Sequence, residues 1–152
     1  YRMAFPDMVG TLELPKDSES QRQGVDRLVH LSNGKTLYID EKKRSVNYGD
    51  ILLEYISNTT RNTPGWIAKP LLIDYLAYAI MPTSTVYFLP WLMLQKAWRD
   101  EGRGWIDKAS ARTPGYTIVD AQNYGYTTRS VAVPVDTIYH AVNRAFRIQV
   151  PV

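Results

Sequence analysis

The sequence predicts an α+β domain in which a central mixed, largely antiparallel sheet is flanked by helices. Three observations support this fold class: short strand-like runs, two helical patterns late in the chain, and enough apolar residues for one core. The chain has 152 residues, 45% of them hydrophobic, and no cysteine. A chain of this length buries roughly 70% of the surface that its unfolded form exposes, so its core needs neither disulfides nor a structural metal. Residues 1–152 show no repeat or linker and are expected to form a single domain.

The first half of the chain predicts one short helix and three strands after an irregular lead-in over 1–17. The strands are runs of apolar and β-branched residues bounded by turn residues. In order, the expected elements are a helix over 18–23 and strands over 25–31, 36–44 and 50–56. Between the first two strands, Asn33 and Gly34 can supply the positive φ angles of a tight turn, which predicts a hairpin.

The second half predicts three further strands and two helices. The apolar stretch 71–94 is interrupted by Asp74, Pro82 and Pro90, so it is not expected to span a membrane. Pro90 suits the first turn of a helix, and Gly102 is expected to end that helix. The expected elements are strands over 73–80 and 85–89, a helix from 90 to 102, a strand over 130–133 and a helix over 135–147.

The composition excludes several classes of function. Without cysteine, and with only His30 and His140, the chain cannot build a thiolate zinc site, a CxxC redox motif or a cysteine nucleophile. No phosphate-binding GxxxxGK[ST] loop and no HExxH motif is present. Metals held by oxygen ligands remain easy to build. The first residues lack the apolar region of a secretory signal, which predicts an intracellular, cytoplasmic location.

The basic residues are concentrated in one part of the chain. The formal charge is only +3, but the stretch 22–44 contains six cations around the carboxylates of interest. Cations beside carboxylates suit a phosphodiester ligand, since the cations hold phosphates and the carboxylates hold a metal. An ordinary solvated hairpin has the same composition. The cations expected to hold a nucleic-acid backbone are Arg22, Arg27, Lys43 and Arg44.

Two aspartates and a lysine are expected to converge at one end of the predicted hairpin. Asp26 opens the first strand, Asp40 lies near the end of the second, and Lys42 shares a strand face with Asp40. Adjacent carboxylates repel each other unless a cation lies between them, and hard oxygen ligands suit Mg²⁺ or Mn²⁺. Such a metal polarises a phosphate and lowers the pKa of a bound water, and Lys42 could orient that water.

The runs 24–26 (Gly-Val-Asp) and 38–42 (Tyr-Ile-Asp-Glu-Lys), separated by a hairpin, resemble the core of the PD-(D/E)XK nuclease superfamily, which has a restriction-endonuclease-like fold. The resemblance covers about 40 residues. It implies that Asp26 and Asp40 are metal ligands, that Lys42 is the catalytic lysine, and that the backbone carbonyl of Glu41 is a further ligand. Glu19 on the preceding helix would be an additional acid.

Two alternatives remain open at this point. A strand slipped by one residue would turn Glu41 and Lys43 to the active face instead of Asp40 and Lys42; the apolar residues before Asp40 favour Asp40. The leading hypothesis is a Mg²⁺- or Mn²⁺-dependent nuclease, acting on DNA rather than RNA, as an oligomer or in a larger complex. The rival hypotheses are an inactive nuclease-like domain that binds nucleic acid or protein, and a structural accessory protein of a phage or mobile element.

Overall fold

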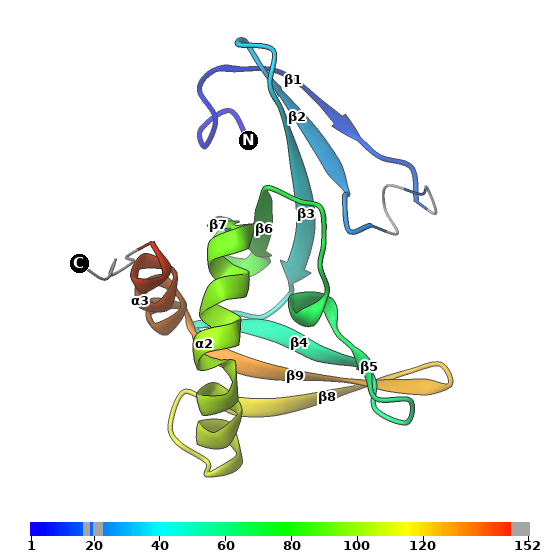
Figure 1. Ribbon diagram of the computed structural model, residues 1–152, viewed down its shortest axis with the longest axis vertical. Coiled ribbons are helices and arrows are strands. Elements are labelled where there is room, and N and C mark those ends of the chain that lie inside the picture. Colours follow the sequence, from blue (N-terminus) through cyan, green and yellow to red (C-terminus); the bar gives the residue numbers. More distant parts are fainter. Residues whose placement is uncertain (17–18, 20–22, 147–152) are drawn as a thin grey trace, which may run out of the picture. The chain divides into compact units, whose positions relative to one another are not determined.

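A computed structural model describes residues 1–16, 19 and 23–146, and it divides the chain into two compact units. The first unit comprises Tyr1–Asn47 and Leu71–Trp91, and the second comprises Tyr48–Pro70 and Leu92–Val152. Each unit is built around its own sheet (Figure 1). The α+β class is therefore confirmed, but the expected single central sheet is replaced by two sheets.

The first unit contains a mixed sheet of five strands in the order β1-β2-β3-β6-β7. All neighbouring strands are antiparallel except β3 and β6, which are parallel. The short 3₁₀ helix η2 (Met81–Thr83) joins the last two strands. The bounds of the strands are β1 (Met8–Glu13), β2 (Arg27–Leu31), β3 (Thr36–Arg44), β6 (Tyr75–Ile80) and β7 (Thr85–Pro90).

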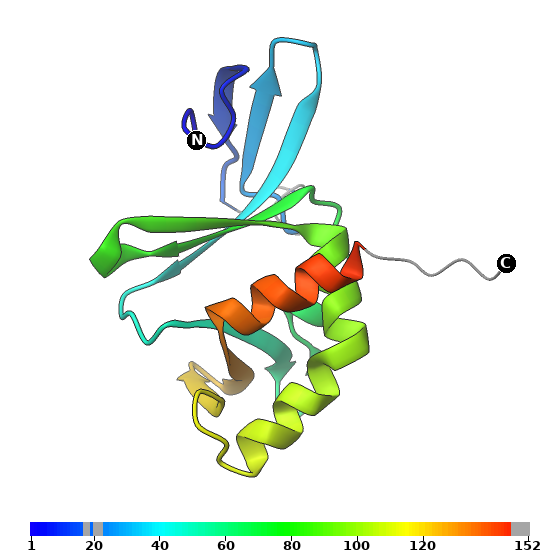
Figure 2. The same ribbon diagram turned by 90° about the vertical axis from the view of Figure 1, so that its left-hand side faces the viewer.

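The predicted hairpin is present as β2 and β3 (Figure 2). Four residues, 32–35, join the two strands, and the Leu31 N–H donates to the Lys35 carbonyl (2.9 Å), which leaves three residues inside that hydrogen bond. Of the two turn residues, Gly34 alone has a positive φ angle, at 82°. This is the pattern of a type I turn followed by one left-handed residue, which places that requirement on the glycine alone.

The expectation of an irregular lead-in over 1–17 is wrong, because β1 lies within it and pairs with β2. Four of the six β1 residues are exposed, and the pairing shifts register between Met8 and Gly10. An edge strand of this kind shows little hydrophobic alternation, so its sequence carries little strand signal.

One face of this sheet packs against the first residues of the chain. Val29, Ile39 and Ala77 are buried on neighbouring strands. The rings of Tyr1 and Phe5 each meet Phe88 edge to face, with centroids 5.5 and 5.2 Å apart. This aromatic packing holds the N-terminal segment against β6 and β7.

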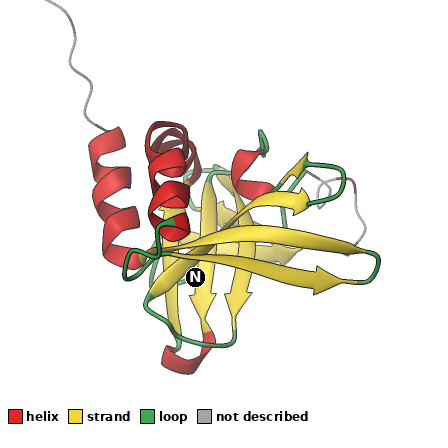
Figure 3. Cartoon of the chain, turned by 90° about the horizontal axis from the view of Figure 1, so that it is seen from below, coloured by secondary structure: helices red, strands yellow, loops and turns green. Residues whose placement is uncertain are grey.

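The second unit contains a four-stranded antiparallel sheet in the order β5-β4-β9-β8. Figure 3 distinguishes its strands from the helices α2 and α3 by colour. The elements are β4 (Asp50–Asn58), β5 (Thr63–Pro64), η1 (Trp66–Ala68), α2 (Trp91–Ser110), β8 (Thr117–Asn123), β9 (Tyr126–Pro134) and α3 (Val135–Ala145).

The strand predicted over 50–56 is present as β4, but it does not continue the β2–β3 meander. It pairs with β9, where Ile51 lies opposite Val133 and Leu53 lies opposite Val131, all four fully buried. The edge of β3 that the meander required is occupied by β6. The nuclease resemblance implies an antiparallel meander of the strands predicted over 25–31, 36–44 and 50–56, and this meander is not formed.

The helix α2 continues past the predicted end at Gly102. That glycine is buried against Trp98, whose ring approaches both Trp105 and Tyr55 at centroid distances of 6.2 and 6.0 Å. A glycine inside a helix is tolerated where tertiary packing outweighs its low propensity. The predicted helix over 135–147 is α3, and residue 147 lies outside the described residues. No strand was expected at β8.

Candidate functional site

The carboxylate of Asp26 is held at the edge of β3, beside Asp40 and Glu41. Asp26 directly precedes β2, and its N–H donates to the Ile39 carbonyl (2.9 Å). Its carboxylate oxygen Oδ2 accepts the N–H of Glu41 (2.8 Å). The side chain of Asp26 thus pairs with β3 at a position just before β2 begins. The hairpin prediction expects Asp26 to lie at this position, close to Asp40.

Asp40 is almost completely buried, with 1% of its surface exposed. The ammonium of Lys42 forms an ion pair with its Oδ1. Its other oxygen, Oδ2, has no hydrogen-bond partner within the described part of the chain. Burial raises the pKa of Asp40 to about 6; Lys42 opposes this increase, and the neighbouring Asp26 carboxylate adds to it.

The carboxylate of Glu41 is engaged differently. Arg27 donates to its Oε1 (2.6 Å) and also reaches Glu13 (3.3 Å), while the hydroxyl of Tyr1 donates to the same Oε1. The Arg27 guanidinium lies over the Tyr1 ring, 5.3 Å from its centroid. Burial alone would raise the pKa of Glu41, but the hydrogen bonds from Arg27 and Tyr1 hold it below its usual range.

These contacts bear on the choice between the two acid-lysine pairs. Side chains alternate along β3, so Asp40 and Lys42 share one face while Glu41 and Lys43 share the other. Asp40 carries the unpartnered oxygen and approaches Asp26, whereas Glu41 is bound by Arg27 and Tyr1. The geometry therefore favours Asp40 and Lys42 over Glu41 and Lys43 as the pair that lies beside Asp26.

A hollow of about 310 Å³ lies at this site. It is lined by Asp26, the β3 residues 41–43, and three residues of the N-terminal segment, Glu13, Leu14 and Lys16. Lys16 and Lys43 are both exposed cations at this hollow. A larger and mostly apolar hollow of about 510 Å³ includes Glu41 but neither Asp26 nor Asp40 in its lining. We place the candidate site at the smaller hollow because Asp26 and Lys42 both line it, whereas Asp40 is buried behind them.

Sequence reasoning missed Tyr1, Glu13 and Lys16 at this site. All three belong to the segment that showed no periodicity, and only the pairing of β1 with β2 brings Glu13 to Arg27. The Pro15–Lys16 pair offered no specific signal of its own.

The structure gives a less clear role to the other residues that were predicted for the site. Glu19 is exposed, and its carbonyl accepts the N–H of Gln23 (3.2 Å); most of the helix expected over 18–23 lies outside the described residues. Arg22 lies outside the described residues. Arg27 forms ion pairs with Glu41 and Glu13. Arg44 is half-buried at the end of β3.

The residues present fit a divalent cation that keeps part of its water shell. Asp26, the Oδ2 of Asp40 and the carbonyl of Glu41 are hard oxygen donors, as Mg²⁺ prefers. The Glu41 N–H points to Asp26, and the carbonyl of a strand residue projects to the same edge as its N–H. No group of three or more acidic or histidine side chains that could hold a metal occurs among the described residues. Two carboxylates and one carbonyl would leave several coordination positions for water or phosphate oxygens.

Comparisons of the chain with protein-family models, curated proteins and solved structures give no match. The class of protein therefore rests on the residues and their geometry alone. Within the described ranges, no helix combines the length and apolar character needed to cross a membrane.

Proposed function

We propose that this chain is a divalent-metal-dependent nuclease that hydrolyses phosphodiester bonds, with DNA as the favoured substrate. The observation that carries the proposal is the pair of carboxylates. Asp40 is buried, burial and the nearby Asp26 raise its pKa, and one of its oxygens has no hydrogen-bond partner among the described residues. Lys42 offsets one of the two negative charges, so a second cation close to the pair would stabilise both carboxylates as anions. The resemblance to the PD-(D/E)XK superfamily supplies the same roles for Asp26, Asp40 and Lys42.

In this proposal, Asp26, Asp40 and the Glu41 carbonyl would hold Mg²⁺ or Mn²⁺. The bound metal would polarise the phosphate and lower the pKa of a coordinated water. Lys42 orients the attacking water through its ammonium, which the ion pair with Asp40 fixes in position. The oxygen of that water forms a bond to phosphorus while the ester bond breaks, and the proton that the water loses ends on the leaving oxygen.

The exposed cations beside the hollow would hold the backbone of the substrate. Lys16 and Lys43 line the hollow and are exposed, which suits contacts with flanking phosphates. Arg44 lies on the same strand, and Arg22 is expected from the sequence to add to this set. Arg27 is better explained as the residue that holds Glu41 in place. An intracellular location and action as an oligomer or within a larger complex stay predictions of the sequence.

The test is cleavage of a panel containing linear, circular, single-stranded and branched DNA together with RNA. Each substrate is incubated with Mg²⁺, Mn²⁺ or EDTA, and wild type is compared with Asp40→Asn and Lys42→Ala. We expect metal-dependent cleavage by wild type and a loss of about 10²- to 10⁴-fold in each variant, the usual range for a group that moves or orients a proton.

The exposed Lys96→Ala, on α2 in the second unit, is the matched control for removal of a lysine that makes an ion pair. It should cut like wild type. If wild type cleaves nothing on the panel, or if Lys42→Ala cuts as well as wild type, the nuclease assignment is wrong. A nucleic-acid-binding or structural protein would then take its place.

A further inference from the structure

An apolar row of three residues crosses the first sheet beside the paired carboxylates. Leu12 of β1 lies opposite Leu28 of β2, and Leu28 lies opposite Tyr38 of β3. Residues directly opposite each other in antiparallel strands point to the same face. Leu12, Leu28 and Tyr38, the apolar row, therefore form one line across the sheet.

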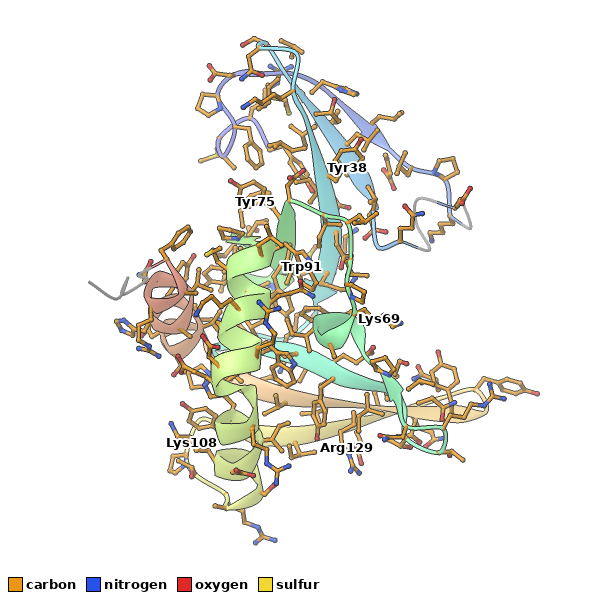
Figure 4. The ribbon with its side chains drawn as sticks, viewed as in Figure 1. Tyr38, Lys69, Tyr75, Trp91, Lys108 and Arg129 are labelled. Carbon is orange, nitrogen blue, oxygen red and sulfur yellow. The ribbon has the colours of Figure 1, made fainter. Side chains whose placement is uncertain are left out.

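The apolar row lies on the same face of the sheet as Asp40 and Lys42. Tyr38 is two residues before Asp40 on β3, so strand alternation places both side chains on one face, about 7 Å apart along the strand. Tyr38 is 45% exposed and Leu12 is 52% exposed, whereas Asp40 is buried. The accessible apolar surface thus begins next to the buried carboxylate (Figure 4, where Tyr38 is labelled).

Tyr38 is also held firmly in place. Its N–H donates to Oδ2 of Asp74 (2.8 Å), and its carbonyl accepts the N–H of Asp74 (2.8 Å). Asp74 directly precedes β6, so these two hydrogen bonds fix the backbone of Tyr38 at the start of the parallel β3–β6 pair. A tyrosine ring on a fixed backbone has only two side-chain torsions, so it loses little conformational entropy when a ligand stacks on it.

The same face continues with polar groups toward the tip of the hairpin. His30 lies opposite Thr36, and their side chains are joined by a hydrogen bond (3.0 Å). Lys35 follows as an exposed cation in the loop. Along this face, Lys42 and Asp40 are followed by an aromatic surface, then by hydrogen-bonding groups, and then by a second cation.

We propose that the apolar row is a stacking platform for the bases of an unpaired DNA strand that leads into the Asp26–Asp40 site. The order of groups matches such a strand, because cations hold its phosphates and aromatic rings stack with its exposed bases regardless of sequence. A fully paired duplex keeps its bases stacked on one another and cannot use this surface. The inference rests on the proposed function and narrows its substrate to single-stranded or locally unpaired DNA.

The test is equilibrium binding of a fluorescent single-stranded oligonucleotide and of the corresponding blunt duplex, measured in EDTA at one fixed salt concentration. Tyr38→Ala should bind the single strand about 5- to 150-fold more weakly, the range for loss of one stacking aromatic. Tyr38→Phe keeps the ring and should bind within about twofold of wild type. Both variants should bind the duplex like wild type.

Tyr124→Ala is the matched control, since Tyr124 is a fully exposed tyrosine between β8 and β9 in the second unit. It should bind the single strand like wild type. The inference is overturned if Tyr38→Ala binds the single strand as tightly as wild type, or if it loses single strand and duplex equally.

Binding in EDTA does not depend on cleavage, so the two proposals can fail separately. Tight, Tyr38-dependent binding by a protein that cleaves nothing would leave the platform standing without the nuclease. Normal cleavage with no effect of Tyr38→Ala would overturn the platform alone.

Discussion

The substitution Asp40→Asn should stabilise the metal-free protein, although it removes a residue proposed to be catalytic. Burial raises the pKa of Asp40 from 3.8 to about 6. An acid with a higher pKa in the folded state binds more protons when folded, so its charge opposes folding above that pKa. The penalty is absent below about pH 4, develops as the pH rises to about 6, and is constant at higher pH.

The size of the penalty follows from the two pKa values. Each pH unit corresponds to 1.36 kcal/mol, so the difference between 3.8 and about 6 amounts to about 3 kcal/mol. Asparagine avoids the buried charge but leaves an amide without a full set of partners, which costs about 1 kcal/mol or more. At pH 8 without metal, we therefore expect Asp40→Asn to be more stable than wild type by up to about 2 kcal/mol.

The assay is urea unfolding followed by circular dichroism at pH 4, 6 and 8, in EDTA and again in Mg²⁺. The advantage of Asp40→Asn should disappear at pH 4, and Mg²⁺ should stabilise wild type but not the variant. Asp120→Asn is the control: this exposed carboxylate pairs with Arg129 (2.7 Å), and its loss should cost less than about 1 kcal/mol. A variant less stable than wild type at pH 8, or an advantage independent of pH, would refute the reasoning.

Three other substitutions test the packing of α2 and the surface charges. Gly102→Ala places a Cβ 2.6 Å from the Trp98 ring and should destabilise the protein by about 1–3 kcal/mol in urea unfolding, despite the better helix propensity of alanine. Gly104→Ala on the same helix meets no atom within 4 Å and should stabilise it by roughly 1 kcal/mol; equal effects of the two would contradict this packing. Lys16→Ala should lower the slope of log K against log salt for DNA binding by about 1, because one phosphate contact is lost. An unchanged slope would remove Lys16 from the binding surface.

The elements best predicted from the sequence are those fixed by local signals. The β2–β3 hairpin follows from its apolar strands and the glycine of its turn, and β3 covers the predicted 36–44. The helix α3 buries Ile138, Ala141, Val142 and Ala145, which repeat at helical spacing. An acidic residue in its first turn and Arg144 in its last turn suit the helix dipole.

The elements that could not be predicted depend on pairing between distant segments. The partner of β4 is β9, more than 70 residues later, and nothing in the local pattern of β4 distinguishes that partner from β3. The strand β1 is mostly exposed and therefore lacks the alternation by which strands are recognised.

In the candidate site too, some features could be predicted from local sequence and others depend on contacts between distant residues. Asp26, Asp40 and Lys42 could be named from their spacing around a hairpin. The sequence prefers Asp40 to Glu41 only through the apolar residues before it, and the structural support comes from Arg27 and from Tyr1, 40 residues earlier, which both bind the Glu41 carboxylate. Residue spacing contains no information about such a contact.

The central claim is that Asp26 and Asp40 form a site for a divalent cation, and calorimetric titration of the metal-free protein with Mn²⁺ tests it most directly. We predict one binding site in wild type, loss of that site in Asp26→Asn and in Asp40→Asn, and unchanged binding in Asp120→Asn. Absence of Mn²⁺ binding by wild type, or equal binding by wild type and Asp26→Asn, would contradict the account.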